Sequence, residues 1–153
     1  MLAAARAEAQ RERESQKAEL VALRRGQVRT LAADAASAGR EIVVRLLERV
    51  GGPDLEHALL DSARRQLAGL SEAGPLATVI VESAGSMAPD ALSSLAEAAK
   101  QNVSSLQHRV VPELGGGVRI VTSRGLVDAS VTGLATYVEL ALAERLGQAA
   151  EHG

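Results

Sequence analysis

The sequence contains no cysteine, no phenylalanine and no tryptophan, and Tyr137 is its single aromatic residue. Without cysteine there is no disulfide framework, no thiolate nucleophile and no cysteine-ligated zinc site, which fits a reducing compartment such as the cytoplasm. Without stacking aromatics, and with a net charge of -2, the chain lacks the features by which proteins hold nucleic acids. We therefore expect no nucleic-acid partner.

Long apolar runs are also missing. No uncharged stretch approaches the roughly 18 apolar residues that a membrane-spanning helix needs, and the first residues do not resemble a signal peptide. We expect a cytoplasmic protein that meets a membrane only indirectly, as a peripheral part of a membrane-bound complex.

Motifs of catalysis and ligand binding are absent as well. The histidines His57, His108 and His152 are far apart in the sequence and form no metal-ligand pair. The cluster Gly115–Gly117 precedes an expected strand, whereas a phosphate-binding loop leads from a strand into a helix. The segment Glu82–Ser86 lacks the G-x-S-x-G nucleophile elbow. The sequence thus predicts a non-catalytic protein without a metal ion or cofactor.

Residues 1–50 have the composition of one long helix. They contain no proline and are rich in Ala, Arg, Glu and Leu, which favour the helical state. At 1.5 Å per residue such a helix is roughly 70 Å long, too long to fold onto a small core. Its ten basic and seven acidic residues contrast with seven and twelve in residues 51–153. The segment Gly51-Gly52-Pro53 therefore marks a boundary between a stalk helix and a second domain.

Apolar residues recur every eleven positions along this helix. One series is Ala9, Leu20, Leu31 and Ile42, and a second is Ala35 and Leu46. An eleven-residue repeat favours a straight or right-handed pairing of helices, and small residues between Ala32 and Gly39 would let a second backbone approach closely. We expect a coiled coil with a helix of another chain, paired through Leu20, Leu31, Ala35, Ile42 and Leu46. The alternative is an ordinary amphipathic helix of a helical bundle.

The rest of the chain predicts a globular domain at residues 54–147 and a tail at 148–153. The expected helices are 54–70, capped by Asp54, then 89–101 and 130–147; the expected strands are 77–82, 106–111, 118–122 and 126–128. The fold class is α+β, a long N-terminal helix followed by a small mixed-sheet domain, in which the strand-helix-strand unit 77–111 has parallel strands. The last helix is expected to bury one face, made of Leu134, Tyr137, Val138, Ala141, Leu142 and Leu146.

Four residues of this domain suit caps and turns. Asp128 and Ser130 flank the start of the last helix, where a side-chain oxygen can accept a hydrogen bond from a backbone N–H. Gly116 and Gly125 suit tight turns, because glycine tolerates a positive φ.

Three segments then resemble a known family. Residues 79–84, 111–120 and 127–131 resemble, in this order, the C-terminal part of the delta (oligomycin-sensitivity) subunit of F-type ATP synthases. Residues 123–130 are equally similar to the stator proteins of flagellar and type III secretion export ATPases, and more loosely to a peripheral-stalk protein of V-type ATPases. The N-terminal globular bundle of a delta subunit and the membrane helix of a b-type stalk protein have no counterpart here.

The resemblance implies a peripheral-stalk subunit of a rotary ATPase, which holds the catalytic hexamer static against the torque of the rotor. Its expected partners are a second stalk helix from another subunit and the catalytic subunits, on whose head residues 54–147 would dock. The alternative is a stator and regulator of a flagellar or type III export ATPase. A small enzyme and a homodimeric coiled-coil adaptor are the remaining classes.

Overall fold

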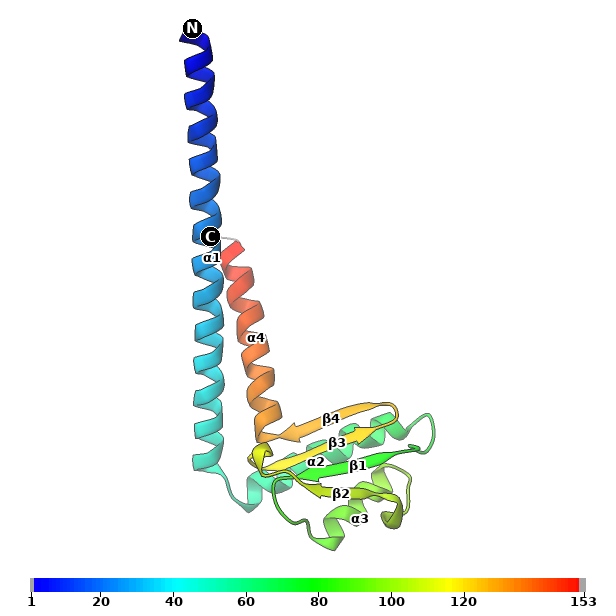
Figure 1. The fold of residues 1–153 in the computed structure, drawn as a ribbon. Helices are drawn as coiled ribbons and strands as arrows, with labels where there is room; N and C mark the ends of the chain where they lie inside the picture. The colour runs from blue at the N-terminus through cyan, green and yellow to red at the C-terminus, as the bar shows by residue number, and fades with distance from the viewer. Residues whose placement is uncertain (1, 152–153) are drawn as a thin grey trace. The chain divides into compact units, whose positions relative to one another are not determined.

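A computed structural model of the chain describes residues 2–151. It confirms the α+β class: one long N-terminal helix is followed by a small mixed sheet and its helices (Figure 1). The chain divides into two units, residues 1–39 with 139–153, and residues 40–138. His152, one of the three histidines, lies outside the described residues.

Helix α1 spans Leu2–Val50, as the absence of proline predicts. Every side chain from residue 4 to residue 31 is exposed, so this half of α1 has no core of its own. Its 49 residues exceed the roughly 12 to 15 that a helix needs for marginal stability in water, and most of them are good helix formers. Intrinsic propensity therefore maintains the first three-fifths of the helix.

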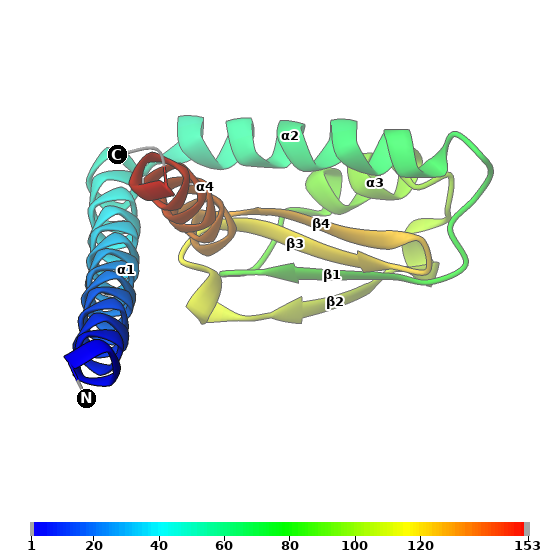
Figure 2. The ribbon, with the colours of Figure 1, turned by 90° about the horizontal axis from the view of Figure 1, so that it is seen from above.

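Within the first unit, α1 has a neighbour from its own chain. Helix α4 (Val131–Glu151) enters this unit at Glu139 and lies beside α1 in both ribbon views (Figures 1 and 2). Ala36 is only 1% exposed, and a Cβ added at Gly39 would run into the side chain of Leu142. Small residues on α1 thus admit the larger side chains of α4 at close range.

The second unit is built on a four-stranded sheet of order β2-β1-β3-β4. Strand β1 (Val79–Ser83) pairs with β2 (Gln107–Val110) in parallel, which confirms the predicted strand-helix-strand unit. Strands β3 (Gly117–Thr122) and β4 (Gly125–Ser130) form an antiparallel hairpin, and β3 also pairs antiparallel with β1. Two 3₁₀ turns, Val103–Ser105 and Pro112–Leu114, flank β2.

Helices α2 (Pro53–Ser71) and α3 (Pro89–Ala98) cover the same face of the sheet (Figure 2). The inward residues of alternate strand positions meet the apolar faces of both helices and form one aliphatic core. Its largest fully buried members include Leu67, Leu76, Val81, Leu95, Ile120 and Val127. One face of the sheet therefore packs against the core. No helix of this unit covers the opposite face.

Two predicted helix ends were wrong. Asp54 does not cap α2, because the helix begins one residue earlier with Pro53 in its first turn and Gly52 at the N-cap. Asp54 instead places a negative charge in the first turn, where the helix dipole favours it. Helix α3 ends at Ala98 and not at Gln101, because Lys100 adopts a positive φ of 54°, which a helix cannot continue.

The C-terminal elements also differ from their predicted bounds. Strand β4 is six residues long, and α4 continues to Glu151, beyond the predicted end at 147. The prediction that Tyr137 is buried was wrong, since it is 71% exposed. The buried face at the start of α4 is instead made by Val131 and Ala135, which are four residues apart. Leu134 and Tyr137 lie to the side of this face and are exposed.

Candidate functional site

The predicted pairing stripe of α1 is an exposed surface in this chain. Leu20, Leu31, Ile42 and Leu46 are 65%, 69%, 66% and 57% exposed, and Ala35 is exposed as well. A single exposed leucine is normal on a protein surface. A continuous row of large apolar side chains along one helix face is typical of an interaction surface. No described residue of the chain covers this stripe.

The neighbouring face of α1 is the one that α4 occupies. Ala32, Ala36 and Gly39 are spaced four and three residues apart, so they share one side of the helix, and each is at least partly buried. Sequence analysis found these small residues but assigned them to a contact with another chain, whereas Gly39 meets Leu142 of the same chain.

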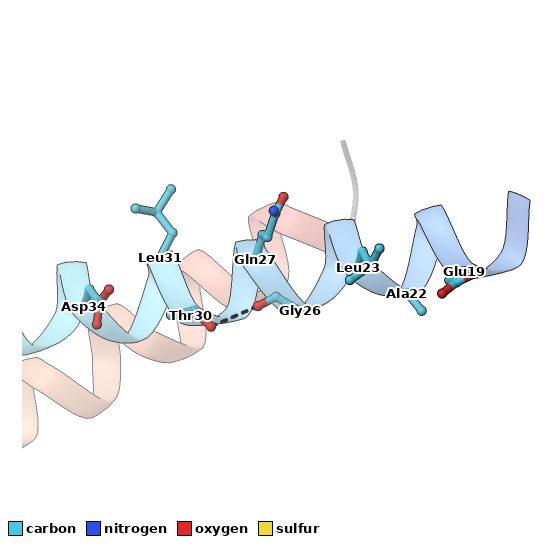
Figure 3. Close-up of a pocket in the computed structure, with 8 residues that line it drawn as sticks. All are labelled: Glu19, Ala22, Leu23, Gly26, Gln27, Thr30, Leu31 and Asp34. Carbon is cyan, nitrogen blue, oxygen red and sulfur yellow. Dashed lines mark hydrogen bonds between the residues drawn. The ribbon is translucent and has the colours of Figure 1, made fainter. Parts of the chain in front are cut away.

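A shallow groove lies on a third face of α1, beside Gly26 (Figure 3). It is lined by Glu19, Ala22, Leu23, Gly26, Gln27, Thr30, Leu31 and Asp34. Because Gly26 has no side chain and nothing lies within 4 Å of where a Cβ would be, the helix surface is notched there. The Thr30 hydroxyl donates to the Gly26 carbonyl 3.1 Å away, so it is already engaged. With walls from a single helix, the groove lacks the convergent polar groups that hold a small ligand.

A hollow of about 320 Å³ lies in the second unit, between the start of α2 and the loop that follows β1. Two of its lining residues, Glu56 and Gly117, are bonded to each other. The Glu56 carboxylate accepts hydrogen bonds from the Gly117 N–H, at 3.1 and 3.3 Å. This contact ties the start of α2 to the start of β3.

At the same hollow, Ser83 lies 2.7 Å from Nε2 of His108, a contact that sequence analysis missed. The Ser83 hydroxyl also bonds the Gly85 carbonyl at 2.6 Å. Since a carbonyl can only accept, the hydroxyl proton points to Gly85 and the His108 ring donates to the Ser83 oxygen. A nucleophilic serine needs the opposite polarity, with its proton held by the histidine. The hydrogen bond therefore links β1 to β2. The predicted parallel pairing of these two strands was the one sequence signal that could have brought Ser83 and His108 together.

The uncovered face of the sheet carries an alternating row of charge. In the strand register, Arg109 lies beside Glu82, Glu82 beside Arg119, and Arg119 beside Asp128. Arg119 bonds Asp128 at 3.2 Å and Glu82 at 3.6 Å. The next row holds Ile80, Val121 and Leu126 beside Gln107 and is mostly apolar; Val121 and Leu126 are exposed. This face is thus a partly apolar, charge-balanced surface.

The four predicted cap and turn residues lie at the ends of β3 and β4. The Ser130 hydroxyl oxygen accepts the Gly133 N–H at 2.9 Å and donates to Asp128 Oδ1 at 2.6 Å. A Cβ at Gly133 would meet the Asp128 carboxylate, so a larger residue there would displace the side chain that bonds Ser130. The carbonyl of Gly116, whose φ is 144°, accepts the Val131 N–H at 3.1 Å.

Gly125, with a φ of 155°, closes the hairpin between β3 and β4. In the same turn, Arg124 donates to the carbonyls of Leu70 and Gly74 at 3.1 and 2.9 Å. The guanidinium therefore satisfies carbonyls at the end of α2, where a cation is favoured. Sequence analysis missed this role, because the 54 residues between Arg124 and Leu70 in the chain give no sign of their proximity.

Two searches of the described residues bear on the class of site. Among residues 2–151, no group of three or more His, Cys, Asp or Glu side chains could hold a metal ion. No helix in the same range has the length and apolar character to cross a membrane.

Comparison with protein-family models and with curated proteins found no match to this chain.

Proposed function

We propose that this chain is a peripheral-stalk subunit of an ion-translocating rotary ATPase, which holds the catalytic hexamer static against the torque of the rotor. The observation that carries the proposal is the exposed apolar stripe of α1, with four large side chains more than half exposed on a 49-residue helix. The sequence resemblance to stalk proteins, carried by residues 79–84, 111–120 and 127–131, supports the choice of a rotary ATPase as the machine.

The mechanism requires stiffness and attachment. A rotor drags the hexamer with it unless a strut links the hexamer to a fixed anchor. A single helix bends readily, whereas a helix paired along an eleven-residue repeat resists bending, because a second row of side chains must be compressed or stretched with it. In this proposal the stripe recruits that second helix, and the sheet unit of residues 40–138 grips the head of the hexamer.

The chain would act without catalysing a reaction. The contact between Ser83 and His108 has the polarity of a structural hydrogen bond, as described above. Membrane association would follow from the complex and not from α1, whose exposed face carries charged residues along its first half.

An export-ATPase stator is the second candidate, favoured by the segment 123–130, which forms the β3–β4 turn and β4. Both candidates use the same stripe, so the architecture does not separate them. They differ in the subunits that accompany the partner helix.

Affinity purification from native cells tests the proposal. The tagged full chain is expected to recover a helical stalk subunit together with a catalytic hexamer and its ion-translocating membrane subunits. Recovery of export-gate components would support the second candidate, and recovery of the chain alone or with unrelated proteins would overturn both.

A matched pair of variants ties this result to the stripe. Leu31→Glu with Ile42→Glu introduces charge on the stripe and is expected to abolish recovery of the partner. Leu23→Glu, compared with the single change Leu31→Glu, introduces the same charge on the same helix, at a residue that is 58% exposed but lies on another face, and is expected to leave recovery intact.

A further inference from the structure

Many of the basic residues of α1 lie on one face of the helix, and most of its acidic residues lie on another. Arg6, Arg13, Lys17 and Arg24 lie on the same line as the apolar stripe, because the whole series advances in steps of three, four or seven residues. The series reads Arg6, Arg13, Lys17, Leu20, Arg24, Val28, Leu31, Ala35, Ile42 and Leu46. The stripe is thus basic along the first half of α1 and mainly apolar along the second, where Arg49 continues the line three residues after Leu46.

Five of the seven acidic residues of α1 follow a different line. Glu12, Glu19, Asp34, Glu41 and Glu48 are separated by seven or fifteen residues, each close to a whole number of turns. This line lies about a third of a turn from the basic stripe. In the described structure, Arg6, Arg13, Lys17 and Arg24 make no ion pair or side-chain hydrogen bond, and all four are exposed.

This distribution disfavours a second copy as the occupant of the stripe. In a parallel pair of copies in register, Arg13 would face Arg13 and Arg24 would face Arg24, and like charges at such distances repel. In an antiparallel pair, the cations of one copy would lie against Leu31 and Ile42 of the other and lose water without gaining a counter-charge.

We propose that the stripe selects a helix of a different chain, with acidic residues opposite Arg6, Arg13, Lys17 and Arg24 and apolar residues opposite Leu31 to Leu46. The inference deepens the proposed stalk function and names the chemistry of its partner. The apolar half supplies the affinity of the pair, and the basic half excludes self-pairing and sets the direction and register of the partner helix.

A charge-reversed copy of the chain provides the probe. Arg13→Glu with Lys17→Glu and Arg24→Glu gives α1 the acidic-then-apolar stripe that the partner is proposed to have. The wild-type chain alone and the variant alone are expected to sediment as monomers. An equimolar mixture is expected to form heterodimers at least about tenfold more tightly than either chain self-associates, and high salt is expected to weaken them.

A control variant carries the same change of charge on another face. Arg11→Glu with Arg25→Glu and Arg29→Glu reverses three cations that lie off the stripe, and its mixture with wild type is expected to remain monomeric. Circular dichroism of each variant checks that α1 stays helical.

Three results would overturn the inference. They are self-association of the wild type as tight as that of the mixture, no association of the mixture, and equal association of the control mixture. These results leave the proposed function standing, because the latter depends on which subunits are recovered from cells. Recovery of a stalk helix that lacks acidic residues along its contact face would likewise overturn only the inference.

Discussion

Helix α1 and the sheet unit contain the same types of aliphatic residue, but the sheet unit buries them and α1 exposes them. In the sheet unit, Leu67 and Ile120 are fully buried among other aliphatic side chains. In α1, Leu20 and Leu31 are as large, yet each is about two-thirds exposed. The buried aliphatic core of the chain therefore lies in residues 40–138, whereas these apolar side chains of α1 are in water and, under the proposed function, would become buried against a partner helix.

The largest expected difference between the regions comes from truncating one leucine in each. Leu67→Ala should lower the free energy of unfolding by about 3 kcal/mol, because it leaves a cavity in the core. Leu31→Ala should change it by less than about 0.5 kcal/mol, because that side chain is already in water. Urea denaturation followed by circular dichroism measures both. Similar losses for the two variants would contradict the division between core and docking surface.

The next effect concerns the backbone of the sheet unit. Gly117 has a φ of 70°, and a Cβ there would run into the Ala129 carbonyl oxygen, so Gly117→Ala should cost about 2 kcal/mol or more. The control is Gly85→Ala, where no atom lies within 4 Å of the added Cβ and φ is not positive. Thermal unfolding of both variants tests the prediction, which fails if Gly85→Ala is the more destabilising change.

A smaller effect is expected at the start of α4. Ser130→Ala removes the oxygen that accepts the Gly133 N–H and should lower the free energy of unfolding by about 1 kcal/mol. Ser93→Ala removes a hydroxyl that bonds the Pro89 carbonyl inside α3 and should be close to neutral. Equal changes in the unfolding midpoints of the two variants would argue against a capping role for Ser130.

The smallest effect is expected on the uncovered face of the sheet. A double-mutant cycle of Arg119→Leu and Asp128→Asn should give a coupling energy of about 0.5 kcal/mol that shrinks at high salt, because the pair is partly exposed. The matched cycle with Glu82→Gln should give less, since its ion pair is longer. A coupling that does not depend on salt would show that packing, and not charge, links the two strands.

Much of the fold followed from local pattern. The lack of proline before Gly51 predicted α1, the β-branched run from Thr78 to Val81 predicted β1, and Pro89 marked the first turn of α3. The helix ends were less predictable. Asp54 and Gln101 lie in sequences that suit helix ends, but Pro53 and the positive φ of Lys100 decided the bounds.

Only some contacts of the candidate sites could be predicted from the sequence. The stripe of α1 was readable, because a helix places residues at eleven-residue spacing on one face whatever surrounds it. The contact of Ser83 with His108 and the bonds of Arg124 to Leu70 and Gly74 were not readable, because they join residues that lie 25 or more positions apart. The exposure of Tyr137 was also missed, since α4 has apolar residues on more than one side.

The sequence by itself determined that α1 is one uninterrupted helix with a basic and apolar stripe, because helix propensity and the 3.6-residue turn act locally. Only the tertiary structure decided which small residues of α1 receive α4, and which face of the sheet the helices cover. The reason is that burial depends on which segments meet in space, and several apolar faces of this chain compete for a limited number of neighbours.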